Sequence, residues 1–462
     1  MSRTIISFYI SILFSWLSFS QVQLGSTFLG QEVGDRYGSV SMNELGSIVA
    51  IASTGTNNSM GSGYLDVKIY DGVNDQWVHR GNRITNPRGN PGTFGFQNRI
   101  ALGGDRLFIG SSSATLDGII YVYNYDNTLA DYVLSSQLTN PEGRYGTLLD
   151  VSSNGNRFIT STSTNVIIHE LTSSGWAVMG TAIPLNANTL AMSRDGNSIA
   201  IGIAGVGAKI FTWDGMQWLQ KGQDLNFNLP FINLGKMIDL SEDGNTIAIS
   251  SETGNVTTNS YKGWCRIYDF DGNTWVQRGS IIEGNPGERL GKSIDLSSDG
   301  KIILLGGSGS SPNGSTSGFS RVYRWYNGEW TDVTVATLGD DSGDRYGSHV
   351  AMNNNGESVI IGTSNSNNLG YAKVYSIKEA LRAFDFVMEW DIQSINTPVI
   401  IPTSGTGYSY DISWGDGQVD RDVTGNAAHF YTATGTYQIR ITGDFPQINY
   451  GSMPNYDSTA FK

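Results

Sequence analysis

A short sequence pattern recurs seven times along this chain of 462 residues, and the repeat limits the fold more than any other feature. A clear copy starts at Gly291, continues through the alternating strand Ser293 to Ser297 and reaches the turn Asp299-Gly300. Tandem copies of about 40–50 residues fold as supersecondary units that bury their apolar faces against their neighbours. The copies start at residues 38, 95, 146, 187, 235, 291 and 347, of which only residue 187 is not a glycine.

Each copy carries the signals of four short strands. In five copies the first ends at an Asn-Gly or Asp-Gly pair, for which we expect a two-residue type I′ turn because these residues tolerate a positive φ. The second is an apolar run such as Ile302 to Leu305, and the third ends in a pair such as Val322-Tyr323. The fourth opens with a tryptophan in most copies, and in four copies a glycine follows it four residues later, at Gly81, Gly180, Gly222 and Gly279.

The composition agrees with many short strands joined by tight turns. The chain has 58 Gly but 11 Pro, only 15% charged residues, and 11 Trp, 22 Tyr and 18 Phe. Collagen would need proline, and disordered chains carry more charge and fewer aromatic residues. We therefore predict an all-β fold in which residues 21–377 form a seven-bladed β-propeller.

The two ends of the repeat region complement each other. The seventh copy stops after Tyr375 without its tryptophan strand, whereas residues 22–30 precede the first copy and match the fourth-strand segment 277–284. We predict that residues 22–30 pair with residues 366–377 and complete the seventh blade, which is an N-terminal strand closure of the ring.

The first twenty residues have the pattern of an export signal. Arg3 precedes the short apolar run Ile5 to Phe19, and the small residues Ser18 and Ser20 favour cleavage before Gln21. We predict that residues 1–20 are a signal peptide, with a buried first strand as the alternative. The mature chain is then exported, extracellular or on the outer cell surface, and we expect no membrane insertion because no other apolar run is long enough.

Three copies open with the same tripeptide, Arg36-Tyr37-Gly38, Arg144-Tyr145-Gly146 and Arg345-Tyr346-Gly347. Together with the Trp-x-x-x-Gly strand, this pattern resembles the FG-GAP repeat of integrin-α-like propellers over about residues 22–377. The resemblance implies a bacterial extracellular propeller used in adhesion or ligand binding. Calcium-binding members carry an Asp-x-Asp-x-Asp-Gly type loop between the first two strands, whereas this chain has a tight turn there, as at Glu242-Asp243-Gly244. We therefore expect no metal and no cofactor.

The composition changes after the repeats. We assign residues 378–384 to a short helical linker and residues 385–446 to a small β-sandwich. Its predicted strands, separated by turn signals, are residues 386–390, 399–401, 408–413, 428–431 and 436–441. Residues 414–417 (Trp-Gly-Asp-Gly), 429–431 (His-Phe-Tyr) and 435–437 (Gly-Thr-Tyr) resemble the PKD-like module. Residues 386–390 (Phe-Val-Met-Glu-Trp) and 401–403 (Ile-Pro-Thr) narrow the resemblance to the form that precedes the leucine-rich repeats of BspA-type bacterial surface proteins. The resemblance implies an interaction domain or a spacer. Residues 447–462 are an irregular tail or part of a truncated further domain.

The sequence offers little for catalysis. The net charge of −13 argues against a nucleic-acid partner, because phosphate binding needs a basic surface. The four histidines lie in different units, Cys265 has no repeated base beside it, and residues 269–275 lack the spacing of a sialidase Asp-box. We expect no catalytic residue. Asp150, Asp239 and Asp295 recur at one strand position, where we expect hydrogen bonds between blades because buried acids must be paired.

One repeated charged position is a candidate ligand-binding site. An arginine stands two residues before the first glycine in four copies, at Arg36, Arg144, Arg289 and Arg345. One interpretation is a ring at one mouth of the central channel that binds an anionic glycan or a peptide carboxylate. The other is pairing with the local acids Asp35, Glu142, Glu288 and Asp344.

These observations favour a secreted or cell-surface, non-enzymatic binding or adhesion protein. It would recognise an extracellular glycan or protein ligand through propeller loops such as Ser53 to Gly63 and Ser308 to Gly318. Two alternatives stay open: a glycan-active hydrolase or lyase on a propeller scaffold, because a sequence does not show which carboxylates meet in space, and a purely structural surface spacer. Neither the ligand nor the oligomeric state follows from the sequence.

Overall fold

The computed structural model describes residues 21–445, apart from residues 33, 54–62, 86–99, 114–115, 204–205, 227–236, 254–260, 310, 327, 334–336, 364–368, 383–384, 396–397 and 405–406. The predicted signal peptide 1–20, the tail 447–462 and the repeat starts Gly95 and Gly235 lie outside the described residues. The described chain consists of strands and one short helix, α1 (Lys378–Arg382), so the all-β prediction is confirmed. It divides into two compact units, Gln21–Arg324 with Asp332–Lys378, and Trp325–Thr331 with the residues from Glu379 onward.

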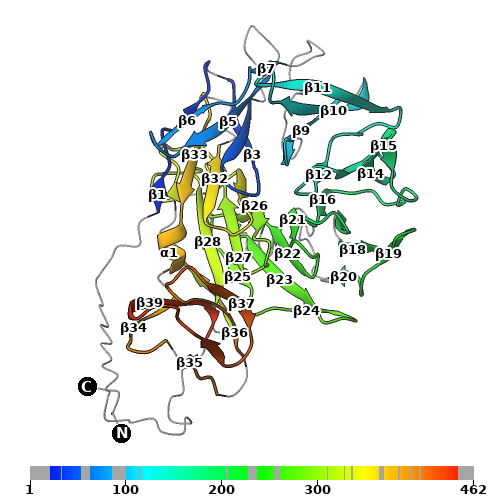
Figure 1. The fold of residues 1–462 in the computed structure, drawn as a ribbon. Coiled ribbons are helices and arrows are strands. Elements are labelled where there is room, and N and C mark those ends of the chain that lie inside the picture. Colours follow the sequence, from blue (N-terminus) through cyan, green and yellow to red (C-terminus); the bar gives the residue numbers. More distant parts are fainter. Residues whose placement is uncertain are drawn as a thin grey trace, which may run out of the picture. The chain divides into compact units, whose positions relative to one another are not determined.

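The repeat region forms seven antiparallel sheets, numbered 1 to 7 here in the order of the repeats (Figure 1). Four strands follow one another in each sheet, and in five sheets a short extra strand pairs with the third. Sheet 1 contains β3 (Tyr37–Met42), β4 (Ile48–Ser53), β5 (Tyr64–Asp71), β6 (Gln76–His79) and β7 (Ile84–Thr85); sheet 2 contains β8 (Ile100–Gly103), β9 (Arg106–Ser113), β10 (Leu116–Asp126) and β11 (Asp131–Asn140); sheet 3 contains β12 (Leu149–Val151), β13 (Arg157–Ser161), β14 (Val166–Thr172) and β15 (Gly175–Val178).

The remaining sheets continue the same order. Sheet 4 contains β16 (Thr189–Met192), β17 (Ser198–Ile203), β18 (Gly207–Trp213), β19 (Trp218–Gln220) and β20 (Leu225–Asn226); sheet 5 contains β21 (Met237–Leu240), β22 (Thr246–Ser251), β23 (Trp264–Phe270), β24 (Trp275–Gln277) and β25 (Ile282–Glu283); sheet 6 contains β26 (Leu290–Leu296), β27 (Ile302–Gly307), β28 (Phe319–Tyr326), β29 (Glu329–Asp332) and β30 (Thr337–Leu338); sheet 7 contains β31 (His349–Met352), β32 (Ser358–Gly362), β33 (Tyr371–Ser376), β1 (Val22–Gln23) and β2 (Phe28–Leu29).

The turn between the first two strands is a hairpin, as expected, but the predicted type I′ is wrong. In sheet 5 five residues, 241–245, separate the strands, and the Gly244 N–H donates to the Ser241 carbonyl at 3.0 Å. Only the glycine has a positive φ there (63°), whereas type I′ needs two such residues. The Asp243 carboxylate fixes the longer turn, because it accepts the Asn245 N–H (2.9 Å) and the Ser241 hydroxyl (2.7 Å).

The first strands of the sheets lie side by side in the order β3, β8, β12, β16, β21, β26 and β31, and β31 lies in turn beside β3. The second strands are the most buried, and every residue of β4, β22 and β27 is buried. Glycine lets successive sheets approach closely: a Cβ on Gly362 would lie 1.9 Å from the Gly38 carbonyl oxygen, and one on Gly306 would lie 2.0 Å from that of Gly347. The repeated glycines are therefore packing requirements between sheets.

The Trp-x-x-x-Gly pattern joins successive sheets at their fourth strands. The Trp275 indole N–H of sheet 5 donates to the Lys221 carbonyl of sheet 4 at 2.8 Å. Its ring lies against Gly222, where a Cβ would come within 2.7 Å of Trp275 Cδ1. Two further indole N–H groups make the same bond at 3.0 Å, from Trp218 to the Met179 carbonyl and from Trp77 to the Leu24 carbonyl.

The prediction that residues 22–30 pair with the last repeat strand is confirmed. Val22 lies opposite Ser376, and Phe28 lies opposite Ala372, so both β1 and β2 pair with β33. Phe28 is buried, and its ring centroid lies 5.9 Å from that of Trp77 in sheet 1. The N-terminal segment thus supplies a strand of sheet 7 and a contact for sheet 1.

The smaller unit contains a four-stranded sheet in the order β34, β39, β36, β37 and a two-stranded sheet of β35 and β38. The strands are β34 (Phe386–Ile392), β35 (Val399–Ile401), β36 (Ser409–Ser413), β37 (Val419–Val423), β38 (Ala427–His429) and β39 (Gly435–Asp444). Five of them lie where the sequence predicted strands. The strand β37 was missed, because the sequence Val-Asp-Arg-Asp-Val carries the charges of an edge strand rather than an apolar run.

The motifs of the smaller unit meet in its core. The Trp414 side chain is fully buried, and its indole N–H donates to Asp420 Oδ2 at 2.9 Å. The indole stacks on His429 with ring centroids 4.9 Å apart, and His429 Nε2 lies 2.8 Å from Asp416 Oδ2. The Tyr431 hydroxyl donates to the Trp414 carbonyl at 2.7 Å. These residues therefore act as one packed group.

Candidate functional site

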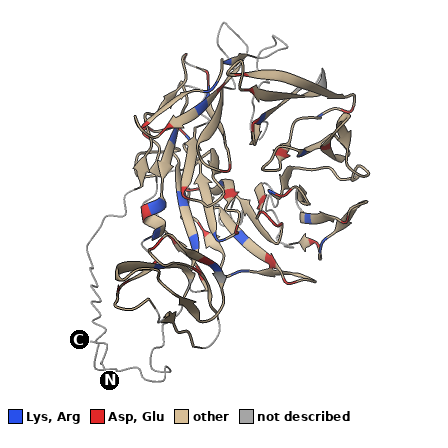
Figure 2. Ribbon diagram, viewed as in Figure 1, with Lys and Arg blue, Asp and Glu red and all other residues tan. Residues whose placement is uncertain are grey.

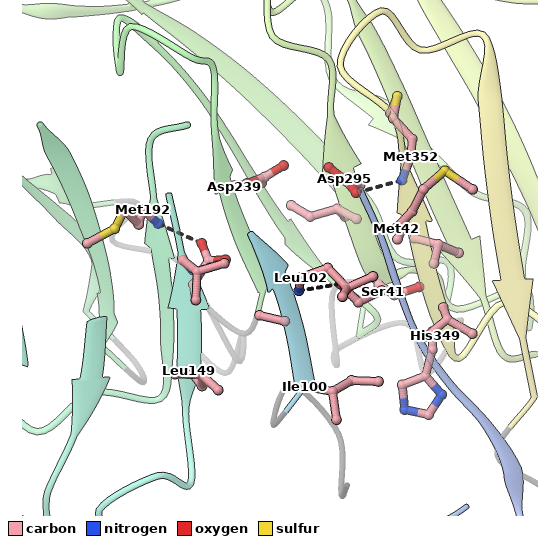
Figure 3. Close-up of a pocket in the computed structure, with 18 of the residues that line it drawn as sticks. Ser41, Met42, Ile100, Leu102, Leu149, Met192, Asp239, Asp295, His349 and Met352 are labelled. Carbon is pink, nitrogen blue, oxygen red and sulfur yellow. Dashed lines mark hydrogen bonds between the residues drawn. The ribbon is translucent and has the colours of Figure 1, made fainter. Parts of the chain in front are cut away.

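A cavity of about 190 Å³ lies where the first strands of the seven sheets meet (Figure 3). Residues of β3, β8, β12, β16, β21, β26 and β31 all contribute to its wall. Figure 3 shows Asp239 and Asp295 close together on one part of the wall, with Ile100, Leu149 and His349 at the other end of the view. The cavity has room for several water-sized molecules.

Carboxylates of the cavity wall join neighbouring sheets. These first strands are sheet edges, and their free N–H groups need acceptors. Each carboxylate accepts the N–H of a residue on the first strand of the next sheet: Asp150 that of Met192 (2.7 Å), Asp239 that of Leu296 (2.6 Å) and Asp295 that of Met352 (2.7 Å). The predicted hydrogen bonds between successive units are confirmed.

The same strand position is not acidic in every sheet. Ser41 takes it in sheet 1, and its hydroxyl accepts the Leu102 N–H at 3.1 Å. Ala101, Ala191 and Ala351 take it in the other sheets and have no side-chain acceptor to offer. The side-chain link therefore joins only some of the successive sheets.

Arg194 is the one lysine or arginine among the residues that line the cavity. It reaches from sheet 4 to sheet 6, where Nη2 donates to the Leu296 carbonyl at 3.0 Å and to Asp295 Oδ1 at 3.4 Å. Its side chain and that of Asp295 are 18% and 19% exposed, because both face the cavity. Sequence reasoning missed Arg194, since it occurs once, in the degenerate copy, and has no counterpart in the other repeats.

The pKa of each of the three cavity carboxylates is raised. Burial raises the pKa of Asp150 to about 6. Burial and the neighbouring Asp295 raise the pKa of Asp239 well above its ordinary value, and burial also raises the pKa of Asp295. The Arg194 charge lowers the pKa of all three, but one guanidinium does not offset three buried acids.

Backbone hydrogen bonds link the turns at one end of the cavity, to which the lining residues Glu44, Ser153 and Arg194 belong. In each bond an N–H of one turn donates to a carbonyl of the next: Ser153 to Arg194 (2.8 Å), Asp195 to Glu242 (3.2 Å), Glu242 to Ser298 (2.9 Å), Ser298 to Asn354 (2.8 Å) and Asn354 to Glu44 (2.9 Å). The turns of sheets 3, 4, 5, 6, 7 and 1 are thereby connected without interruption.

The four candidate arginines share a left-handed backbone. Their φ angles are 51° (Arg36), 71° (Arg144), 54° (Arg289) and 52° (Arg345), a conformation that non-glycine residues rarely adopt. The bend turns the next side chain into the space between two sheets, and Tyr37, Tyr145, Leu290 and Tyr346 are all at most 2% exposed. Part of the Arg-aromatic-Gly pattern is therefore a requirement of sheet packing.

The guanidinium groups of these arginines have few partners among the described residues. Arg144 Nη1 lies 3.5 Å from Asn186 Oδ1, and Arg289 Nη1 lies 4.0 Å from a Glu252 carboxylate oxygen. Arg36 has a buried Nε without a hydrogen bond, and no ion pair within 4.0 Å involves Arg36, Arg144 or Arg345 in the described chain.

The expected pairing of each arginine with its neighbouring acid is wrong for these residues, because the acids bind other groups. Glu288 binds Arg321 through two bonds of 2.6 and 3.0 Å. Asp35 accepts the Gln31 N–H and the Tyr64 hydroxyl, Asp344 accepts the Asp341 N–H and the Tyr371 hydroxyl, and Glu142 accepts the Asn165 side-chain amide.

The arginines do not line the cavity itself. Each stands three or four residues before a lining residue, namely Ser39, Leu148, Ser293 or Ser348, at the end of the first strand away from the linked turns. Among the described residues, lysines and arginines are interspersed with acids rather than gathered in one block (Figure 2). The four arginines are therefore separate positive charges outside the cavity and not part of one large basic surface.

One predicted recognition loop makes backbone hydrogen bonds to the segments that contain Arg289 and Arg345. In Ser308 to Gly318, of which all but residue 310 is described, the Gly309 N–H donates to the Glu288 carbonyl (3.0 Å) and the Thr316 carbonyl accepts the Arg345 N–H (2.9 Å). Arg289 and Arg345 thus flank one loop. Of the other predicted loop, Ser53 to Gly63, residues 54–62 lie outside the described chain.

His169, His349 and Cys265 of the repeat region are buried, whereas His79 is exposed. The His169 ring stacks on Phe158 at 4.6 Å and lies 3.0 Å from the Tyr145 hydroxyl, and burial lowers its pKa to about 4, as suits the predicted packing role. Cys265 is buried, which raises the pKa of its thiol. Within the described residues, no group of three or more His, Cys, Asp or Glu side chains is arranged to hold a metal ion, and no helix has the length and apolarity to cross a membrane.

No protein-family model matches this chain, and no curated protein matches it in sequence.

Proposed function

We propose that the repeat region is a seven-bladed β-propeller with N-terminal strand closure and that the smaller unit is a PKD-like β-sandwich. The order of the first strands, which leads from β31 back to β3, supports the propeller, and so does the Trp77 bond to Leu24 of the N-terminal segment. The contact of Asp416 with His429 beside Trp414 supports the PKD-like reading, because the motifs that carry the resemblance pack together.

We propose that the protein is an exported, extracellular, non-enzymatic binding protein whose ligand is an anionic glycan or a carboxylate-bearing protein segment. The main observation in support is the repeated arginine. It occupies a strained backbone position in four sheets and is not neutralised by the acid beside it. A glycine would satisfy that backbone at lower cost, so the guanidinium is the reason for an arginine there. A planar guanidinium binds carboxylate and sulfate groups through paired hydrogen bonds.

The cavity acids support binding over glycoside hydrolysis. A glycosidase keeps its two carboxyl groups about 5–9.5 Å apart so that a sugar or a water fits between them. Asp239 and Asp295 instead each have a carboxylate oxygen that accepts a backbone N–H of the next sheet. These oxygens are engaged in holding sheets together.

The test is binding of residues 21–462 to an array of neutral, carboxylated and sulfated glycans. We expect retention on an anionic class and a loss of about tenfold or more in the double variant Arg289→Ala/Arg345→Ala, since a charge-assisted hydrogen bond contributes roughly 1.5–3 kcal/mol. Arg421→Ala is the matched control, because this exposed arginine lies in the smaller unit, outside the repeats.

Three outcomes would contradict the proposal in different ways. Unchanged affinity in the double variant would remove the arginines from the site. Cleavage of a retained glycan would favour the hydrolase or lyase, and no retention of any glycan or protein ligand would favour the structural spacer.

A further inference from the structure

Tyr261 and Arg289 form an exposed pair at the junction of sheets 5 and 6. Tyr261 precedes β23, and Arg289 precedes β26. The Arg289 N–H donates to the Tyr261 carbonyl at 2.9 Å, and the guanidinium carbon Cζ lies 4.9 Å from the centroid of the tyrosine ring. A cation over an aromatic ring is attracted to its π-face. A flat apolar group and a positive charge therefore lie next to each other on the surface.

The backbone of Tyr261 is strained. Its φ is 38°, in the left-handed region that bulky residues rarely adopt and that glycine adopts without cost. Tyr261 is nevertheless the most exposed tyrosine among the described residues, at 39%. Packing within the protein therefore does not account for an aromatic residue at this position, and strained residues of this kind cluster at ligand sites.

The charges around Arg289 leave room for an anionic ligand. A Glu252 carboxylate oxygen lies 4.0 Å from Arg289 Nη1, but the other lies 3.4 Å from Lys292 Nζ. Glu288, beside Arg289 in the chain, binds Arg321 at 2.6 and 3.0 Å. These three cations and two acids carry one net positive charge. Because both acids have a nearer cation, Arg289 is the group whose charge is least balanced.

The next junction has the same backbone arrangement but a different side chain. The Arg345 N–H donates to the Thr316 carbonyl at 2.9 Å, and the φ of Thr316 is also positive, at 53°. In both junctions the residue after the arginine forms a β-bridge with a glycine, Leu290 with Gly263 and Tyr346 with Gly318. The backbone thus accepts a threonine as well as a tyrosine, and the aromatic ring distinguishes the junction at Arg289.

We propose that Tyr261 and Arg289 form a subsite for one acidic sugar ring, so that the ligand of the repeat region is an acidic glycan. The guanidinium pairs with the carboxylate or sulfate group of the sugar, and the tyrosine ring packs on the C–H face of the same sugar. An acidic sugar carries its charge on a ring with apolar C–H groups and so matches both features. An acidic peptide side chain offers the charge but needs no aromatic surface. This inference rests on the proposed binding function.

The test measures the affinity of residues 21–462 for three probes with equal numbers of acidic groups: hexamers of galacturonate, of sulfated galactose and of glutamate. We expect the wild type to bind at least one of the two sugar hexamers. Tyr261→Thr, which copies the side chain of the next junction, should weaken that binding by about three- to tenfold and leave the affinity for the glutamate hexamer unchanged. Thr316→Tyr should strengthen sugar binding, because it gives Arg345 an aromatic neighbour.

Tyr261→Phe is the matched control, because it keeps the ring at the same strained backbone position, and we expect it to bind the sugar like the wild type. Tyr261→Thr is expected to fold, since Thr316 occupies the same backbone arrangement. Circular dichroism and the Tm check this. If Tyr261→Thr does not fold, Thr316→Tyr decides: a gain in affinity for the sugar supports the subsite, and no gain overturns it.

The remaining outcomes separate this inference from the proposed function. Equal sugar binding by Tyr261→Thr and the wild type, together with a loss in Arg289→Ala, would overturn the subsite and leave the proposed function standing. Binding of the glutamate hexamer alone would overturn the subsite in favour of a protein ligand. Binding of none of the three probes would count against both.

Discussion

Arg345 has a φ of 52°, a backbone conformation that costs a non-glycine residue roughly 1–2 kcal/mol. Its side chain is exposed and makes no ion pair among the described residues, so the guanidinium group does not offset that cost. The same backbone recurs at Arg36, Arg144 and Arg289. At the scale of the residue, Arg345 therefore combines a backbone role, which glycine would fill better, with an exposed side chain that makes no ion pair among the described residues.

This combination predicts that the two roles separate by mutation. Arg345→Gly removes the strain and is expected to raise the free energy of unfolding by about 0.5–1 kcal/mol, after the greater freedom of the unfolded glycine is subtracted. Arg345→Ala keeps the strain and is expected to leave stability nearly unchanged. Urea unfolding measures both variants, and both should weaken ligand binding equally. A loss of stability in Arg345→Gly would show that the guanidinium stabilises the fold.

The residues that could be predicted from the sequence are those that the repeat marks. Asp150, Asp239 and Asp295 stand at one position of a recurring strand, so a shared role between sheets was readable without a structure. Arg194 occurs once, in the copy that lacks the first glycine, and its reach to sheet 6 depends on how the sheets lie in space. The hydrogen-bond partners of Asp35 and Glu288 could not be predicted either, because a turn N–H competes with the neighbouring arginine for each carboxylate.

At the scale of the element, the strands were more predictable than the turns between them. The apolar runs predicted the second strands, such as Ile302–Gly307, because a strand that is buried on both faces is apolar throughout. The turn type depended on side chains that local propensity does not weigh: Asp243 and Ser241 bond to each other and to the turn N–H groups, and they favour five residues over two. The strand β37 could not be predicted from an apolar run, because an edge strand carries charged residues.

The packing of Trp275 against Gly222 of the preceding sheet gives a prediction for the fourth strands. Gly222→Ala introduces a Cβ about 2.7 Å from Trp275 Cδ1 at a φ of 70°, so it adds a collision to the backbone strain. Gly215→Ala is the matched control in the same sheet, because its φ of 103° is also strained but no atom lies within 4 Å of the new Cβ. Urea unfolding should show a loss of roughly 1 kcal/mol for Gly215→Ala and about 1–3 kcal/mol more for Gly222→Ala. Equal losses would mean that the contact between sheets is not close in solution.

At the scale of the whole molecule, the repeat is a set of sheets that each contact two neighbours. Stability in such an array is shared between the units and their interfaces. The junction of sheet 7 with sheet 1 differs from the others, because residues 22–29 come from the opposite end of the chain. The carbonyl of Leu24 receives the Trp77 indole N–H, and the ring of Phe28 packs on Trp77. Loss of this segment should therefore weaken sheets at both ends of the repeat region.

Phe28→Ser tests that coupling, and Leu29→Ser is its matched control. Phe28 is 8% exposed and Leu29 is 61% exposed, although both belong to β2 and pair with β33. Removing a buried phenylalanine costs about 3 kcal/mol or more, whereas a change at an exposed leucine costs little. Hydrogen exchange should speed up in β33 and also in β5 and β6 of sheet 1 for Phe28→Ser, and in neither sheet for Leu29→Ser. Faster exchange confined to β33 would mean that the N-terminal segment completes sheet 7 without supporting sheet 1.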